Sequence, residues 1–230
     1  MFRTKMKTTC PGRVTARERT VLQRSLVVGV AIIFVGCNFG PSAVRQPAID
    51  ASRAGKEALA LYDSNHDGVI SGDELEHAPA IKAALPRLDT NGDGGVSADE
   101  VAARVKAWKA MESGMTSVRM HFTLDGQPLV GAKVTLEPEP FLGTEIKVAT
   151  GTTTQFGDVS PTIAKEDRPA PNLPGGANFG LYKVRVSKAV NGKETIPARY
   201  NIETTLGQEV SYDDPGMKSN NITFALKQGG

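Results

Sequence analysis

The chain has 230 residues, of which 40% are hydrophobic and 23% are charged. The hydrophobic fraction is too high for a wholly disordered chain and too low for a protein that crosses a membrane several times. Two cysteines exclude a disulfide-rich scaffold and any metal site built from four thiolates. Residues 1–36 hold seven of the 27 Lys and Arg and one of the 25 Asp and Glu, so the rest carries 20 basic and 24 acidic residues. Such a mildly acidic remainder has no electrostatic reason to bind nucleic acid.

The first 36 residues have the pattern of an export signal. A stretch rich in Lys and Arg precedes an apolar run from Leu26 to Gly36, which ends directly before Cys37. As a helix this run would cover about 17 Å, whereas the hydrocarbon core of a bilayer is about 30 Å thick. A basic stretch followed by a short apolar run is typical of a secretory signal rather than a membrane-spanning helix. We therefore predict a signal peptide over residues 1–36.

The end of this signal indicates a lipid anchor. Phe34-Val35-Gly36-Cys37 resembles the lipobox of bacterial lipoproteins, in which the cysteine is acylated and becomes the first residue of the mature protein. The resemblance implies lipidation at Cys37 and a location in the bacterial cell envelope, at the outer membrane or a periplasmic face. Two or three acyl chains hold a protein firmly on a membrane, whereas a single chain binds reversibly. Simple secretion and an uncleaved anchor are the alternatives.

A tether is predicted to follow the lipid anchor. Residues 37–53 contain Pro, Ala and Ser and show no hydrophobic period, as is typical of a linker. A flexible chain of this length spans about 20–25 Å on average. The tether would therefore hold a domain clear of the lipid headgroups.

An internal repeat with a period of 26 residues lies within a helix-like segment, residues 54–113. Residues 63–74 read DSNHDGVISGDE, and residues 89–100 read DTNGDGGVSADE. Both fit the pattern D-x-[DN]-x-[DN]-G-x5-E, which places oxygen-bearing side chains at alternate positions of a loop. Ca²⁺ prefers roughly six to eight oxygen ligands, and this spacing supplies them. A solvated Asp/Asn/Gly turn is the alternative, which two tandem matches disfavour.

Each loop of twelve residues assigns a role to each ligand position. Positions 1, 3 and 5 give side-chain oxygens, position 7 gives its backbone carbonyl, position 9 acts through water, and the final glutamate gives both carboxylate oxygens. The glycine at position 6 allows a sharp turn, and the aliphatic residue at position 8 can pair with the other loop. We therefore predict two bound calcium ions. The predicted ligands are Asp63, Asn65, Asp67, Val69, Ser71 and Glu74 in the first loop and Asp89, Asn91, Asp93, Gly95, Ser97 and Glu100 in the second.

On these motifs, residues 54–113 resemble the EF-hand family. The 14 residues between the loops, 75–88, are fewer than a standard pair uses for two full helices, which leaves the pairing of the loops open. Pro79 is expected to begin the second incoming helix, and Pro86 to kink it. Gly95 indicates a looser second loop and hence a tighter first site.

The EF-hand resemblance allows both a fixed module and a sensor. A sensor exposes an apolar, methionine-rich groove when it opens. Val101, Val105 and Trp108 recur at helical spacing, and this stripe favours a buried core. Calcium is often plentiful outside the cytosol, which suits a constitutively filled site.

Residues 116–230 change to a period of two, as in Val118, Met120, Phe122 and Leu124. This alternation predicts half-buried strands, and six or seven short strands suggest a β-sandwich. The motifs Leu-Asp-Gly-x-Pro at 124–128, Gly-x-Tyr-x-Val at 180–184 and Phe-x-Leu at 224–226 occur in an order that resembles the carboxypeptidase-regulatory-like, transthyretin-type β-sandwich of bacterial surface lipoproteins. The resemblance implies a non-catalytic module. Further strands are predicted around Val134/Leu136, Ile146/Val148, Tyr182/Val184/Val186, Val210/Tyr212 and Ile222/Phe224/Leu226.

No catalytic motif is found in the sequence, so we predict that the protein is not an enzyme. There is no Gly-x-Ser-x-Gly, phosphate-binding loop or His-Glu-x-x-His. The residues interpreted as solvated surface or turn positions are His66, His77, His121, Glu137, Glu139, Asp213 and Asp214.

The predicted fold class is multidomain α + β, with a lipoprotein signal, a helical EF-hand pair and a C-terminal all-β sandwich. The expected partners are calcium, a membrane through the lipid anchor, and an envelope protein or polysaccharide, without nucleic acid. A structural or interaction role at the envelope is the leading hypothesis. A calcium-responsive sensor or regulator of an envelope complex is the alternative.

Overall fold

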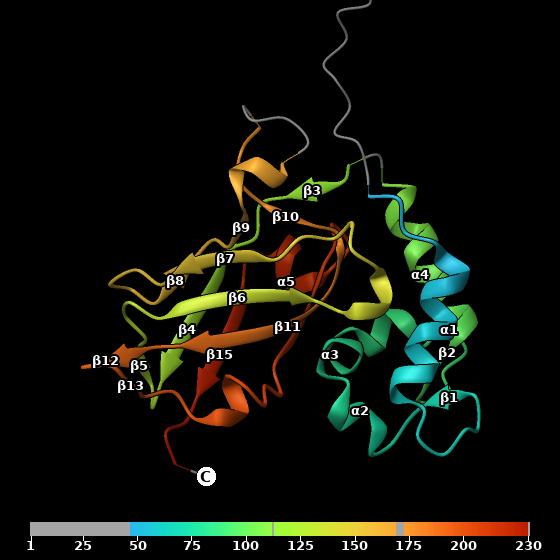
Figure 1. Cartoon of the computed structure of the whole chain (residues 1–230), viewed down its shortest axis with the longest axis horizontal. Helices are drawn as coiled ribbons and strands as arrows, with labels where there is room; N and C mark the ends of the chain where they lie inside the picture. The colour runs from blue at the N-terminus through green and yellow to red at the C-terminus, as the bar shows by residue number, and fades with distance from the viewer. Residues whose placement is uncertain (1–46, 112, 169–172, 230) are drawn as a thin grey trace, which may run out of the picture. The chain divides into compact units, whose positions relative to one another are not determined.

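Helices and strands occupy separate stretches of the chain, which makes the fold α + β (Figure 1). The computed structural model describes residues 47–111, 113–168 and 173–229. The predicted signal peptide and Cys37 lie outside these residues. No helix in the described ranges has both the length and the apolar character needed to cross a bilayer. The helical part comprises α1 (Ala51–Tyr62), α2 (Glu74–His77), α3 (Pro79–Leu88) and α4 (Ala98–Lys109), with the short strands β1 (Val69–Ile70) and β2 (Val96–Ser97).

Two sheets follow the helices. The larger has the strand order β14-β11-β6-β7-β9, and the smaller has the order β15-β4-β5 with β8 also paired to β4. β15 and β4 run parallel, whereas the larger sheet is antiparallel throughout its described strands. The larger sheet consists of β6 (Lys133–Pro138), β7 (Ala149–Thr152), β9 (Thr162–Ile163), β11 (Gly180–Ser187) and β14 (Gly207–Val210). The smaller consists of β4 (Met120–Leu124), β5 (Gln127–Pro128), β8 (Asp158–Val159) and β15 (Ile222–Leu226).

Short elements connect these strands. The strands β3 (Met115–Thr116) and β10 (Ala177–Asn178) form one two-stranded pair, and β12 (Ala189–Val190) and β13 (Lys193–Glu194) form another. The short helices are η1 (Pro140–Leu142), η2 (Lys165–Asp167), η3 (Ala198–Tyr200) and α5 (Pro215–Lys218).

The central strand β11 shows why this part of the sequence forms a sheet. Its alternate residues Tyr182, Val184 and Val186 are fully buried. Val184 lies opposite Leu136 of β6, and both side chains point into the core. Buried β-branched and aromatic residues at every second position favour a strand because successive side chains alternate between the two faces.

Most of the strands predicted from alternation are present. β6, β11 and β15 cover the predicted positions, and β4 covers those from Met120 to Leu124. Val118 lies before β4, and Tyr212 lies beyond β14, which ends at Val210. The prediction around Ile146 and Val148 is displaced, because β7 begins at Ala149. Ile146 is nevertheless buried, and it packs in the core from a bend that precedes the strand. The specific resemblance to a transthyretin-type sandwich stays a prediction.

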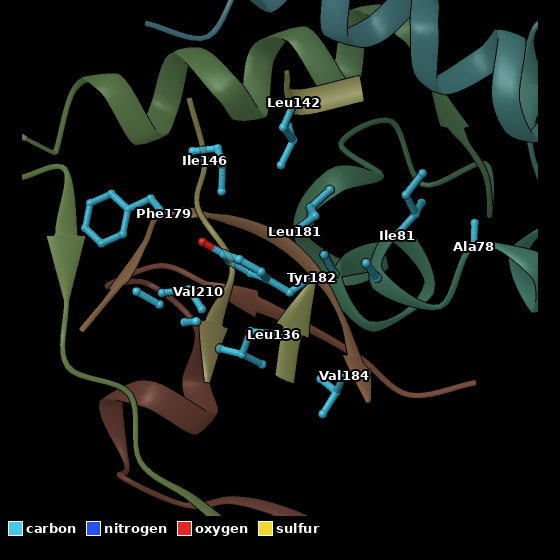
Figure 2. Packing of buried hydrophobic residues seen from close by; sticks show 14 of the residues in the cluster. Ala78, Ile81, Leu136, Leu142, Ile146, Phe179, Leu181, Tyr182, Val184 and Val210 are labelled. Carbon is cyan, nitrogen blue, oxygen red and sulfur yellow. The ribbon is translucent and has the colours of Figure 1, made fainter. Parts of the chain in front are cut away.

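The helices and the larger sheet share one hydrophobic core, and the described residues belong to a single compact unit. Helix α3 lies against β14 and β11. Figure 2 shows buried side chains of this core from α3 (Ile81), η1 (Leu142) and β11 (Leu181). A side chain at Gly207 of β14 would lie 2.0 Å from the carbonyl oxygen of Pro79. Glycine at that position therefore permits the close approach of helix and strand.

The first helix begins earlier than the predicted EF-hand segment. Ile49, within the stretch assigned to the tether, is only 5% exposed. A side-chain oxygen of Asp50 accepts a 3.0 Å hydrogen bond from the backbone N–H of Arg53. An aspartate in this position satisfies one of the free N–H groups of the first helical turn. The helix consequently starts at Ala51.

Candidate metal centre

Each predicted calcium loop lies between two helices. The first loop, residues 63–74, follows α1 and leads into α2, and the second, residues 89–100, follows α3 and leads into α4. Pro79 is the first residue of α3, as predicted, and Pro86 lies inside that helix, which continues to Leu88. The first outgoing helix, α2, has only four residues. The short spacing between the loops is thus accommodated by one truncated helix.

The two loops pair through their central residues. β1 and β2 are antiparallel, with Ile70 opposite Val96 and Val69 opposite Ser97. Ile70 and Val96, the two residues at position 8, are fully buried. A side chain at Gly95 would lie 2.2 Å from Cγ1 of Val69. Glycine at this position therefore makes room for the neighbouring strand. The sequence analysis interpreted Gly95 only as a source of flexibility in the second loop and did not foresee this role.

The first loop is organised by hydrogen bonds from its own backbone. Oδ2 of Asp63 accepts from the N–H of Gly68 at 2.9 Å. Oδ1 of Asn65 accepts from the N–H of Asp67 at 2.8 Å, and Oδ1 of Asp67 accepts from the N–H of Val69 at 3.0 Å. Gly68, at position 6, has a φ of 90°, which a residue with a side chain rarely adopts.

The second loop repeats this arrangement. Oδ2 of Asp89 accepts from the N–H of Gly94 at 2.9 Å, the same bond as between positions 1 and 6 of the first loop. Oδ1 of Asn91 accepts from the N–H of Asp93, and Oδ1 of Asp93 accepts from the N–H of Gly95. Gly94 has a φ of 86°. The two sequence repeats therefore share these hydrogen bonds of positions 1 to 7. They differ at position 10, where Gly72 has a φ of 52° and Ala98 begins α4.

The closing glutamates are bonded to the beginnings of the loops. Oε1 of Glu74 accepts from the backbone N–H of Ser64 at 2.8 Å and from its hydroxyl at 3.0 Å. Oε1 of Glu100 accepts from the N–H and hydroxyl of Thr90 at 2.9 and 3.1 Å. Sequence reasoning overlooked these hydroxyls at position 2, although Ser64 and Thr90 occupy equivalent places in the repeat.

Hydrogen bonding keeps both glutamates ionised. The N–H of Ser71 lowers the pKa of Glu74, and the other bonds to this carboxylate outweigh the effect of burial. Burial raises the pKa of Glu100, but the bonds from Ser97 and Thr90 lower it below its ordinary value. An N–H that donates to a carboxylate favours its charged form. Both side chains are therefore anionic at neutral pH.

The chemistry of the donor groups fits calcium. At its six predicted ligand positions each loop offers three carboxylates, one amide, one serine hydroxyl and a backbone carbonyl. These are the hard oxygen donors that Ca²⁺ prefers. Among the described residues, no group of three or more His, Cys, Asp or Glu side chains is gathered closely enough to hold a metal ion. Glu74 and Glu100 instead accept hydrogen bonds from backbone N–H groups of their own loops.

The three histidines lie outside these predicted ligand sets. His66 and His77 are exposed, as predicted. His121 is only partly exposed, and its Nδ1 lies 3.1 Å from Oδ1 of Asp158. The surface prediction is wrong for Glu139, which is fully buried, and for Asp214, which is 5% exposed.

Comparison with known proteins bears on the helical segment. A family model described as EF hand matches residues 56–77 and 81–105. No curated protein and no solved structure matched the chain. The two matched ranges contain all twelve residues of each predicted loop and all or part of the helices on either side. The match supports an EF-hand pair within residues 56–105 and, with it, calcium binding.

Proposed function

We propose that the protein binds two calcium ions, one in each EF-hand loop, and acts as a structural or interaction module of the bacterial cell envelope. The observation that carries the proposal is the repeated hydrogen bonding of the loops, in which position 1 bonds to position 6 in both loops. The pairing of Ile70 with Val96 further supports two sites that form together. The residues proposed to hold the ions are those predicted from the spacing, positions 1, 3, 5, 7, 9 and 12 of each loop.

The charge of each loop supports a divalent ligand. Asp63, Asp67 and Glu74 place three negative charges at the predicted ligand positions of the first loop, and the second loop has the same number at its own. These charges repel one another without a cation, so binding and ordering of the loop are coupled. Mg²⁺ is a poorer occupant, because it demands six ligands at shorter distances and retains its waters.

The proposed role is non-catalytic. Two of the carboxylates interpreted from the sequence as surface or turn positions are engaged in ion pairs: Glu137 with Arg185, and Asp213 with Arg104. These bonds to guanidinium groups favour a structural role for both carboxylates. The lipid anchor at Cys37 and export rest on the basic stretch, the short apolar run and the lipobox-like residues before the cysteine.

Calorimetric titration of the full chain in detergent tests calcium binding. We expect two sites in the parent, and the loss of one site in each of Glu74→Gln and Glu100→Gln. Glu76→Gln is the matched control, because Glu76 lies just outside the first loop and pairs with Lys82 at the surface. Absence of calcium binding to the parent at millimolar concentration would refute the proposal.

Detergent phase partition tests the anchor. The parent, expressed in bacteria, should enter the detergent phase, and Cys37→Ser should remain in the aqueous phase. Cys10→Ser is the control, since Cys10 lies in the predicted signal and should have no effect. Retention of Cys37→Ser in the detergent phase would show that acylation at this residue does not anchor the protein.

A further inference from the structure

A buried carboxylate joins the second EF-hand to the larger sheet. Glu209 of β14 is fully buried. Its Oε2 accepts a 2.5 Å bond from Nε of Arg87, and its Oε1 accepts bonds of 2.6 and 2.8 Å from Nε of Arg104 and Nε1 of Trp108. Arg87 belongs to α3, and the other two donors belong to α4. One carboxylate therefore holds both helices that flank the second loop.

Two aspartates extend this network. Nη2 of Arg87 lies 2.8 Å from Oδ2 of Asp214. Nη1 and Nη2 of Arg104 donate to the two oxygens of Asp213 at 2.7 and 2.6 Å. Such charge-assisted bonds are shorter and stronger than bonds between neutral groups. We name this set of residues the clamp; it comprises Arg87, Arg104, Trp108, Glu209, Asp213 and Asp214.

The clamp belongs to the second loop alone. Arg87 lies two residues before residues 89–100, and Arg104 lies four residues after them. The period of 26 places Leu61 and Ala78 at the equivalent positions around the first loop. Neither side chain carries a charge, so the first hand has no equivalent attachment at these positions. The two hands are thus alike in their loops and different in how they are held.

This attachment opposes the motion of a sensor. When a sensor EF-hand opens, the angle between its helices changes from about 130–140° to about 90–100°. α3 and α4 cannot turn apart while Arg87 and Arg104 both bind Glu209. Separation would leave charged groups buried without partners, which proteins avoid. The clamp instead transmits stabilisation of the second loop to β14.

We propose that the clamp makes the second loop and the larger sheet one cooperative unit, so that calcium stabilises β14 instead of opening the hand. This inference rests on the proposed function, because it requires an ion in the second loop. If the ion must leave before β14 opens, amide exchange in the strand slows about 100-fold when calcium is at 100 times its dissociation constant.

Hydrogen–deuterium exchange of the full chain, with calorimetry on the same samples, tests the proposal. Calcium should slow exchange of residues 207–210 about 100-fold in the parent. In Arg104→Lys both sites should still bind calcium, but the effect on these residues should fall below about tenfold, because an ammonium group cannot bond both carboxylates as the guanidinium does. Arg119→Lys, which alters an exposed pair with Asp158, should behave as the parent.

The native fluorescence of Trp108 gives a measurement that needs no variant, since the chain has one tryptophan. Its emission maximum and its quenching by acrylamide should be the same with and without calcium. A red shift on adding calcium would show an opening hand and overturn the proposal. The proposal would also be overturned if calcium slowed amide exchange of residues 207–210 as much in Arg104→Lys as in the parent, or if a parent that binds calcium showed no slowing. Either result would leave the proposed function intact. A parent without calcium binding would overturn both.

Discussion

The hydroxyl of Tyr62 donates a 2.6 Å hydrogen bond to Oε2 of Glu139. Tyr62 is the last residue of α1, and Glu139 lies between β6 and η1. The bond thus ties the helix that enters the first calcium loop to the connection leaving a central strand of the sheet. Oε1 of Glu139 is buried and has no hydrogen-bond partner among the described residues. Burial raises the pKa of this carboxyl above its ordinary value.

The raised pKa of Glu139 predicts a loss of stability as the pH rises. The folded state binds the proton more tightly than the unfolded chain, whose glutamate pKa is about 4.3. The stabilising contribution is therefore complete below that value and is lost as the pH rises through the folded pKa. Glu139→Gln keeps the acceptor for Tyr62 and cannot ionise.

Urea unfolding in calcium-free buffer checks this expectation. Glu139→Gln should be more stable than the parent at pH 8 by about 1–3 kcal/mol, because a buried carboxylate pays a desolvation penalty on ionising that a neutral amide does not. The difference should disappear near pH 4. Glu137→Gln, which alters a partly exposed neighbour paired with Arg185, should show no such convergence. A constant difference for Glu139→Gln at both pH values would contradict the assignment.

Removal of Arg104 should cost far more stability than removal of an exposed arginine. Arg104→Met leaves Glu209 buried with one of its two guanidinium partners missing. Loss of one partner from a buried ion pair costs about 3–5 kcal/mol. Arg119→Met is the comparison, because the Arg119 side chain is 56% exposed and surface pairs contribute only about 0–1 kcal/mol. Similar unfolding free energies for the two variants would show that the clamp contributes little.

Asp213 should give a pH dependence of the opposite sign to that of Glu139. Hydrogen bonding to Arg104 lowers the pKa of Asp213 to about 2. The stabilisation is therefore present above the unfolded aspartate pKa of about 3.9 and is lost as the pH falls toward the folded value. The stability advantage of the parent over Asp213→Asn should shrink between pH 5 and pH 2 in chemical unfolding. An advantage that grows on acidification would exclude this pairing as its source.

The calcium loops could be predicted because their determinants are local. Twelve consecutive residues carry the predicted ligands and the glycine with positive φ, and position 8 marks the buried pair of Ile70 and Val96. The alternation in β11 is likewise contained in eight residues. The start of α1 was assigned to the tether instead, although Asp50 before a helical run is a capping signal. The role of Gly55 in that helix could not be predicted, because a side chain there would lie 2.1 Å from the carbonyl oxygen of Ala98, which is distant in the sequence.

The clamp could not be predicted because its members are distant in the sequence. Arg87 and Glu209 are 122 residues apart, and Arg104 and Asp213 are 109 apart. No period or motif relates such residues, and isolated charges are mostly found at the surface. Separate domains were expected because the contacts between the helices and the sheet join residues that are distant in the sequence. The packing of α3 on β14 shows that helices and sheet share a core.

Gly95→Ala tests whether the paired strands couple the two proposed calcium sites. The added carbon would lie 2.2 Å from Cγ1 of Val69 and 3.1 Å from Cβ of Ser71, so β1 and β2 would have to separate. Overpacking of this kind costs about 1–3 kcal/mol, and we expect calorimetry to show weaker binding at both loops. Val69→Ala in the same chain removes the closest atom and should restore most of the affinity. Weakening confined to the second loop would show that the sites act independently, because the strain would then not pass from Gly95 to the first loop.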